Sequence, residues 1–191
     1  GGVYLFNGLQ RLVSPVDINP ARLPRLTMGA WVKTASLVSG WRKVIGHDNG
    51  GYDRTIGLDT RVGAFHYAAF TGTGLLDGGV GPVDTNAWTF LAATYDRDTS
   101  TITLYVDPDV SAPITPLISV EATAGFGAGF STTAIGGLRP DNADEGWQGA
   151  IDNVFFYQTV LSMEELIGIR NGGAAAILPQ PQQQPEITDV E

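Results

Sequence analysis

The spacing of apolar residues along the chain predicts an all-β fold. Apolar side chains alternate with smaller or polar ones over Leu26–Lys33, which is typical of a strand with one buried face. Trp88–Tyr95 is apolar on both faces, and Thr101–Val106 alternates again after the polar turn Asp96–Ser100, so these runs predict a hairpin. Further strands are predicted at residues 1–6, 44–45, 55–58, 64–70, 133–135 and 151–157. Because no helical pattern separates the strands, we expect an antiparallel sandwich rather than an α/β fold.

One helix is predicted near the end of this strand-rich region. Ser162 and Glu165 have the spacing of a capping box, and Leu161 and Leu166 are placed for a hydrophobic staple around it. Gly172 can adopt the left-handed conformation that ends a helix. We expect a helix of about two turns that lies across one end of the sandwich.

Residues 174–191 differ in composition from the rest of the chain. Three alanines lead into a segment of alternating proline and glutamine, followed by an acidic end without basic residues. Such a segment has too few apolar residues for a core and favours an extended chain. The sequence therefore predicts one domain over residues 1–173 and a tail or linker over 174–191.

Charge and composition exclude several classes of function. The 191 residues carry a net charge of -9, which repels a nucleic-acid backbone and suits calcium or basic partners. The chain has no cysteine, so thiol catalysis, disulfides and cysteine–zinc sites are excluded, and two histidines are too few for a multi-histidine metal site. No apolar run is long enough to span a membrane.

Several segments in a fixed order resemble one known family. The chain is similar to the laminin-G-like domains of the concanavalin A-like lectin/glucanase superfamily, of the type found in bacterial surface proteins. This resemblance implies a two-sheet jelly roll with one concave sheet, an extracellular or cell-surface location, and binding of glycans or proteins, often with calcium. The segments that carry it are Leu26–Lys33, Ala87–Asp96, Leu104–Asp107, Ile135–Gly137, Trp147–Tyr157 and Leu161–Leu166, with Gly46–Asp59 between them.

Some relatives in this superfamily are glycoside hydrolases, but the acidic residues here do not favour that reaction. Glycosidases use two carboxylates that flank the scissile bond, and the hydrolases of this fold carry two glutamates on one strand. Of the six glutamates in the chain, Glu164 and Glu165 lie in the predicted helix, and no predicted strand carries a pair. Since a G-x-S-x-G motif is also absent, a hydrolase is the least favoured function and we expect no enzyme activity.

The predicted ligand-binding residues lie on one glycine-rich loop. Asparagine and aspartate side chains hydrogen-bond sugar hydroxyls, and a tyrosine ring stacks on a sugar face. Loops at the ends of a sandwich are common recognition sites. The alternative is a long turn in which Asp53 and Arg54 simply form an ion pair. The candidates are His47, Asp48, Asn49, Tyr52, Asp53 and Arg54.

Two places could supply oxygen ligands for calcium. In the resembling family, the aspartate at Asp152 helps to hold a calcium ion beside the first strand, where Asn7 could contribute. The alternative is that Asp152 hydrogen-bonds backbone amides. The second place is the acidic loop with Asp141 and Asp144, for which the alternative is a solvated surface loop.

Trp41 and His66 are the remaining residues for which the sequence suggests a position. Trp41 is expected near the surface, where it could contact a partner, and His66 is expected as a core or edge histidine rather than a ligand. The favoured function is a non-catalytic recognition domain for carbohydrate or protein, supported by calcium. The second is an accessory subunit of a larger assembly that docks through the sandwich surface and the tail.

Overall fold

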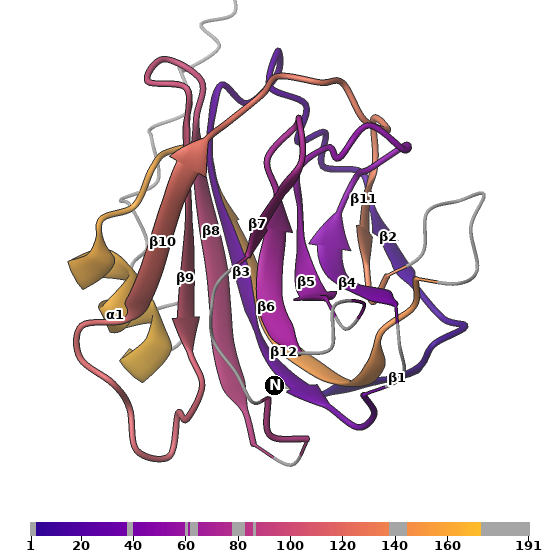
Figure 1. The fold of residues 1–191 in the computed structure, drawn as a ribbon, viewed down its shortest axis with the longest axis vertical. Helices are drawn as coiled ribbons and strands as arrows, with labels where there is room; N and C mark the ends of the chain where they lie inside the picture. The colour runs from indigo at the N-terminus through magenta and orange to yellow at the C-terminus, as the bar shows by residue number, and fades with distance from the viewer. Residues whose placement is uncertain are drawn as a thin grey trace, which may run out of the picture.

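The computed structural model describes residues 3–37, 40–59, 61, 65–77, 83–85, 87–137 and 145–172. It is a sandwich of two six-stranded antiparallel sheets with one helix (Figure 1). This architecture confirms the predicted all-β jelly-roll class.

The first sheet, sheet A, has the strand order β1-β12-β3-β8-β9-β10. Its centre is the predicted hairpin, in which Asp96 at the end of β8 pairs with Thr101 at the start of β9. The strands are β1 (Tyr4–Asn7), β12 (Gln148–Tyr157), β3 (Arg25–Thr34), β8 (Thr89–Asp96), β9 (Thr101–Asp107) and β10 (Ile118–Thr123).

The second sheet, sheet B, has the order β2-β11-β4-β5-β6-β7. The strands β2, β7 and β10 were not predicted, because each is short or lies at the edge of a sheet, where the apolar alternation is weak. The strands are β2 (Leu12–Ser14), β11 (Thr133–Ile135), β4 (Trp41–Gly46), β5 (Thr55–Asp59), β6 (His66–Phe70) and β7 (Leu75–Asp77).

The main core lies between the two sheets. Alternate residues of the central strands point into it, as the period of two in their sequences predicts. Sheet A contributes Leu26, Met28, Leu91, Tyr95, Ile102 and Leu104, and sheet B contributes Val44, Ile56, Leu58, Tyr67 and Leu76.

A second apolar cluster covers the outer face of sheet A and explains why β8 is apolar on both sides. Phe90 and Ala92 alternate with the core residues of β8 and pack in one cluster with Leu166 and Ile169 of α1 (Met163–Gly172). The helix therefore lies on the outer face of sheet A, beside β9 and β10 (Figure 1). The prediction that it lies across one end of the sandwich is wrong, because its apolar side chains pack against Phe90, Tyr105 and Phe155 on the outer face of sheet A.

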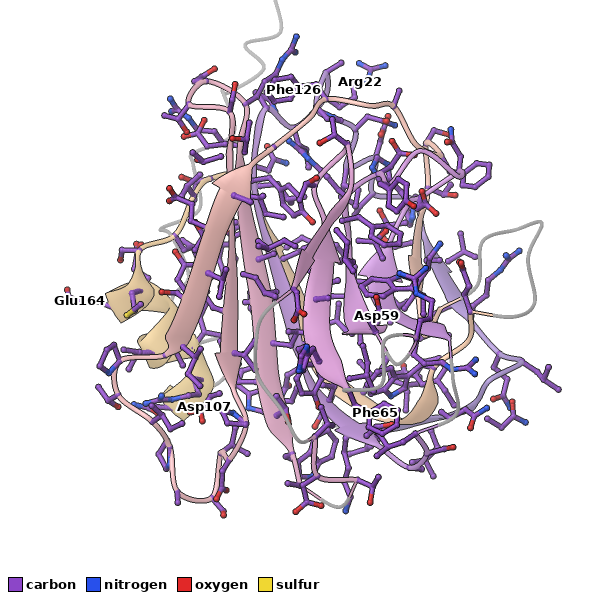
Figure 2. The ribbon with its side chains drawn as sticks, viewed as in Figure 1. Arg22, Asp59, Phe65, Asp107, Phe126 and Glu164 are labelled. Atoms are coloured by element: carbon purple, nitrogen blue, oxygen red, sulfur yellow. The ribbon has the colours of Figure 1, made fainter. Side chains whose placement is uncertain are left out.

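A buried ion pair ties α1 to sheet A. Arg170 Nη1 lies 3.0 Å from Asp107 Oδ2, and both side chains are nearly inaccessible to solvent. Arg170 also donates hydrogen bonds to the carbonyl of Ile114 and the hydroxyl of Thr115. Figure 2 shows Asp107 at the end of β9 beside the helix. The connection after β9 is thus held by the same guanidinium that anchors α1.

The capping box at the start of α1 is present as predicted. The Ser162 hydroxyl accepts a hydrogen bond from the amide of Glu165 at 3.3 Å, and the Glu165 carboxylate accepts one from the amide of Ser162 at 2.7 Å. Leu161 and Leu166 are both buried on either side of this box.

We predict that Ser162→Ala lowers the free energy of unfolding by about 1 kcal/mol, because an amide of the first turn loses its acceptor. Urea denaturation followed by tryptophan fluorescence measures the change. Glu164→Gln in the same turn is the control and should change stability by less than about 0.5 kcal/mol. Equal losses in both variants would contradict the role of the cap.

Candidate ligand-binding site

The outer face of sheet B carries an aromatic and cationic cluster. The rings of Trp41 and Phe70 are stacked, with their centroids 4.5 Å apart. Lys43 Nζ lies 5.8 Å from the centroid of the Phe70 ring. Trp41 is only 2% exposed, so the prediction of a surface tryptophan is wrong. The residue does lie on the outer face of sheet B, but its ring stacks on Phe70 and is shielded from solvent.

Lys43 is a buried cation paired with two carboxylates. Its Nζ lies 3.0 Å from Asp48 Oδ2 and 2.7 Å from Glu145 Oε2, and the Lys43 side chain is 4% exposed. Burial raises the pKa of Asp48, but the charge and hydrogen bond of Lys43, together with donated amides, outweigh it, so the pKa lies below its ordinary value. Because both carboxylates neutralise Lys43, this cluster is not a receptor for anions.

The loop from His47 to Arg54 is built around two aspartates. Asp48 Oδ1 accepts hydrogen bonds from the amides of Gly50 at 3.0 Å and Asp53 at 3.2 Å. Asp53 Oδ2 accepts one from the amide of Asn49 at 3.2 Å. The side-chain amide of Asn49 donates to the carbonyl of Ala128 at 2.9 Å. These bonds fix the loop, and together with the Lys43 contact they engage both Asp48 oxygens and one Asp53 oxygen that were predicted to contact a ligand.

His47 and Arg54, at the two ends of the loop, also point inward. His47 Nδ1 lies 3.1 Å from the carbonyl of Phe130, and burial lowers the pKa of its imidazole. Arg54 donates to the carbonyls of Ile18 at 2.9 Å and Leu23 at 2.6 Å, and burial lowers the pKa of its guanidinium to about 10. Arg54 therefore binds the segment from Ile18 to Leu23. The sequence had suggested that it forms an ion pair with Asp53 instead.

Tyr52 is the aromatic side chain that this loop presents to solvent. Its backbone has a φ of +59°, a left-handed conformation that tyrosine rarely adopts. The residue is 45% exposed, and its ring contacts Phe70 edge-on, with centroids 5.2 Å apart. Of the six predicted ligand-binding residues, Tyr52 and Asn49 are exposed and the other four are buried. The loop thus holds one rigid aromatic ring at the rim of sheet B.

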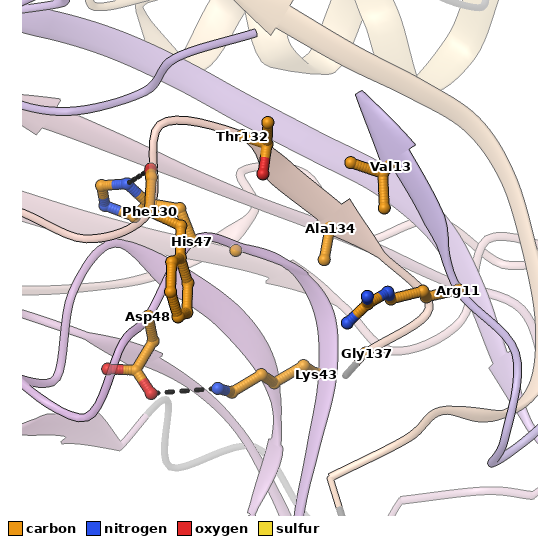
Figure 3. A pocket seen from close by; sticks show the side chains of 10 residues that line it. Arg11, Val13, Lys43, His47, Asp48, Phe130, Thr132, Ala134 and Gly137 are labelled. Carbon is orange, nitrogen blue, oxygen red and sulfur yellow. Dashed lines mark hydrogen bonds and ion pairs between the residues drawn. The ribbon is translucent and has the colours of Figure 1, made fainter. Parts of the chain in front are cut away.

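A small pocket lies beside this loop on the same face of sheet B (Figure 3). Its open volume is about 20 Å³, which holds roughly one water molecule. A sugar ring therefore does not fit inside, and a larger ligand would lie across the rim. This pocket was not predictable from the sequence, because its walls come from strands far apart in the chain. They are lined by Arg11, Val13, Lys43, His47, Asp48, Phe130, Thr132 and Ala134.

Several buried polar atoms around β4 and β5 have no hydrogen-bond partner within the part of the chain that the structure describes. They are Trp41 Nε1, His47 Nε2 and Thr55 Oγ1. Trp41 and Thr55 lie on the two strands, and His47 directly follows β4. Since buried polar groups are normally paired, these atoms are positions where bound water or hydroxyl groups are needed.

The residues predicted for calcium at the first strand are not brought together. Asn7 pairs with Gln148 on β12, whereas Asp152 lies beyond the Ile151–Tyr4 pair at the other end of the ladder. The separation is roughly 13 Å at about 3.3 Å per residue, too far for both to ligate one calcium ion. Asp152 instead accepts a hydrogen bond from an adjacent amide at 2.7 Å.

The other calcium candidates lie in a different part of the chain. Asp141 and Asp144 fall outside the described residues. Among the residues that the structure does describe, no group of three or more His, Asp or Glu side chains could hold a metal ion. His66, the second histidine, lies on β6 inside sheet B, and its Nδ1 is 2.8 Å from Asp77 Oδ2 on the edge strand β7.

Two packed antiparallel sheets with loops at the ends define the lectin-like class of β-sandwich. The family comparison agrees, since residues 14–167 match the concanavalin A-like lectin/glucanases superfamily. The chain belongs to this family. No curated protein matches it. Within the described residues, no helix is long and apolar enough to cross a membrane.

Solved structures with the same fold share little sequence with this chain. A heptameric SAP-like pentraxin from Limulus polyphemus has a TM-score of 0.60 and 13% identity over 88% of this chain and 80% of its own. A putative carbohydrate-binding protein from Bacteroides ovatus has a TM-score of 0.62 and 15% identity, over 86% of this chain and 45% of its own. The CBM40 of the Ruminococcus gnavus IT-sialidase, bound to α2,3-sialyllactose, has a TM-score of 0.53 and 16% identity, over 85% of this chain and 98% of its own. This chain thus spans less than half of the Bacteroides protein.

Proposed function

We propose that this chain is a non-catalytic recognition domain that binds carbohydrate across the outer face of sheet B. The observation that carries the proposal is Tyr52, whose exposed ring is held in a rare backbone conformation by a loop with two buried aspartates. A preformed aromatic surface binds a sugar face without the cost of ordering a mobile side chain. Carbohydrate-binding proteins among the similar folds support this class of ligand.

The acidic residues support a binding role over hydrolysis. Among the described strands, only β10 contains a glutamate, Glu121. Glu145 is paired with Lys43, and Glu165 is used in the capping box. A glycosidase needs two carboxylates on either side of one bond, and these side chains lie on separate elements.

We predict that Tyr52→Ala weakens binding to the best glycan on an array by at least about tenfold, which corresponds to about 1.4 kcal/mol. Isothermal titration calorimetry with that glycan measures the loss. Tyr52→Phe keeps the ring and should bind within about twofold of the wild type. The stability of Tyr52→Ala should stay close to that of the wild type, since the ring is half exposed.

The outcomes separate this proposal from its alternatives. Undiminished binding by Tyr52→Ala would place the sugar elsewhere. A blank array would instead support a protein ligand, which is the second kind of partner that the sequence predicts. Tyr4→Ala removes a comparably exposed aromatic ring from β1, an edge strand of sheet A, and should leave glycan binding unchanged.

Calcium support and location stay predictions. Both oxygens of Asp48 and Oδ2 of Asp53 are already engaged by Lys43 and backbone amides, so we expect glycan binding through this face to persist in a chelator. A role for calcium at Asp141 and Asp144 is a separate prediction. An extracellular or cell-surface location is proposed from the family and from the laminin domains among similar folds.

A further inference from the structure

The N-terminal edge of the sandwich exposes an unusual amount of apolar surface. Six of the exposed large apolar side chains in the described residues fall within eleven consecutive positions, which we call the N-terminal edge patch. The stretch holds a single charged residue, Arg11. The patch consists of Val3 (49% exposed), Tyr4 (59%), Leu5 (77%), Leu9 (73%), Leu12 (39%) and Val13 (57%).

The sheet topology brings β1 and β2 to one side of the molecule, where the patch wraps around the edge from Val3 on the outer face of sheet A to Val13 on the outer face of sheet B. β1 is an edge strand of sheet A and β2 is an edge strand of sheet B. A groove of about 210 Å³ lies between the two edges. Its lining is mostly apolar, with two polar residues at one end: Tyr4, Phe6, Leu12, Ile135, Ile151, Val154, Asp152 and Asn153. The open side of the sandwich therefore presents two strand edges with a mostly apolar groove between them.

Neither strand carries the features that normally keep an edge from pairing with another chain. Exposed edges are usually protected by lysine, proline, inward charges or bulges. β1 contains no charged residue or proline, and its pairing with β12 has no bulge. β2 is also uncharged. On the other side of the sandwich, the edge strands β10 and β7 carry Glu121 and Asp77.

We propose that the N-terminal edge patch is the interface of a symmetric homodimer. The six side chains expose roughly 600 Å² of surface, the upper end for the largest apolar patch of a monomer. Complete burial of this surface in two copies would amount to roughly 1,200 Å², the lower bound for a specific stable interface. Because the patch is nearly free of charge, a second copy can cover it despite the net charge of -9, which salt screens at this distance.

The contacts along β1 indicate how far strand pairing could extend. The amide of Asn7 already donates to the Gln10 side chain at 2.9 Å, so the free edge stops there. Pairing between two copies would thus involve residues up to Leu5, and side-chain burial would supply most of the affinity. Leu5 is the most exposed apolar side chain of the patch and is expected to lie at the centre of the interface.

Sedimentation equilibrium of the full 191-residue chain at 150 mM salt tests this. We expect the wild type to sediment at twice the monomer mass of 20.2 kDa at micromolar concentration. Leu5→Glu and Leu9→Glu should each raise the dimer dissociation constant at least tenfold. Both side chains are largely exposed in the monomer, so circular dichroism and thermal melting of these variants should confirm an intact fold.

Phe126→Glu is the matched control. Phe126 is 43% exposed and lies at a different end of the molecule from β1, so this variant should remain dimeric. A wild type that is monomeric at 100 µM would overturn the proposal and would leave the patch to a different protein. A dimer that tolerates Leu5→Glu and Leu9→Glu, or that is weakened equally by Phe126→Glu, would also overturn it. Loss of glycan binding by Tyr52→Ala has no bearing on this result.

Discussion

Replacing Lys43 with methionine is expected to lower the free energy of unfolding by about 3–5 kcal/mol. The variant removes the cation that lies 3.0 Å from Asp48 and 2.7 Å from Glu145 and leaves the buried Asp48 carboxylate without its counter-ion. Methionine keeps most of the volume of the side chain, so the loss reports the charge rather than a cavity. Urea denaturation at pH 7 measures it.

The pH dependence distinguishes this mechanism from poor packing. In the wild type, the pKa of Asp48 lies below its ordinary value of 3.8, so its contribution to stability is complete above about pH 5 and is lost as the pH falls through the folded-state pKa. In Lys43→Met, burial without a cation raises the pKa of Asp48, which favours the protonated folded form in acid. The gap between the two proteins should therefore narrow between pH 7 and pH 4. A constant gap would contradict the electrostatic explanation.

An exposed ion pair of the same type provides the comparison. Arg25 Nη2 lies 2.7 Å from Asp98 Oδ2, but both side chains are more than half exposed. Arg25→Met should therefore cost no more than about 1 kcal/mol. A similar loss for Arg25→Met and Lys43→Met would mean that burial does not set the strength of these pairs.

Replacing Arg170 with methionine is expected to have a comparable effect, again about 3–5 kcal/mol. Asp107 is completely buried and would lose its partner, and the carbonyl of Ile114 would lose its donor. Because Arg170 belongs to α1, the helix should detach first and uncover the outer face of sheet A. Urea denaturation measures the loss, and binding of a dye that fluoresces on apolar surfaces should report the uncovered face.

Two further variants test the assignment to this ion pair. Arg170→Lys keeps the charge but not the planar fork that reaches Asp107 and Thr115 together, so it should recover only part of the stability. Asp107→Asn combined with Arg170→Met should be more stable than Arg170→Met alone, since no buried charge remains. A double variant at least as unstable as the single one would show that packing, not the charge, is lost.

The central strands were predictable because a strand with one buried face has alternating apolar and polar residues in its sequence. Leu26–Lys33 and the hairpin of Trp88–Tyr95 with Thr101–Val106 appear in the structure within one or two residues of their predicted ends. The helix start was predictable for a similar reason, since Ser162 and Glu165 interact over three residues. The predicted tail over 174–191 lies outside the described residues.

The candidate site was only partly predictable. The loop from His47 to Arg54 was found from its glycines and polar residues, and the exposure of Tyr52 agrees with that prediction. The inward orientation of the Arg54 side chain was not predictable, because its hydrogen-bond partners are the carbonyls of Ile18 and Leu23, more than thirty residues away in the chain. Lys43 gave no signal, since a lysine in a strand normally faces solvent.

The sequence by itself determined the fold class, the central strands and the helix cap, because these depend on local periodicity and on contacts between near neighbours. The tertiary structure decided which polar groups are buried, which are exposed and which meet. Asn7 and Asp152 were assigned to one calcium site, yet the register of β1 on β12 places them at opposite ends of the ladder. Trp41 and Phe70 are distant in the chain, yet they stack. Register and sheet order set these distances through long-range strand pairing, which no local pattern encodes.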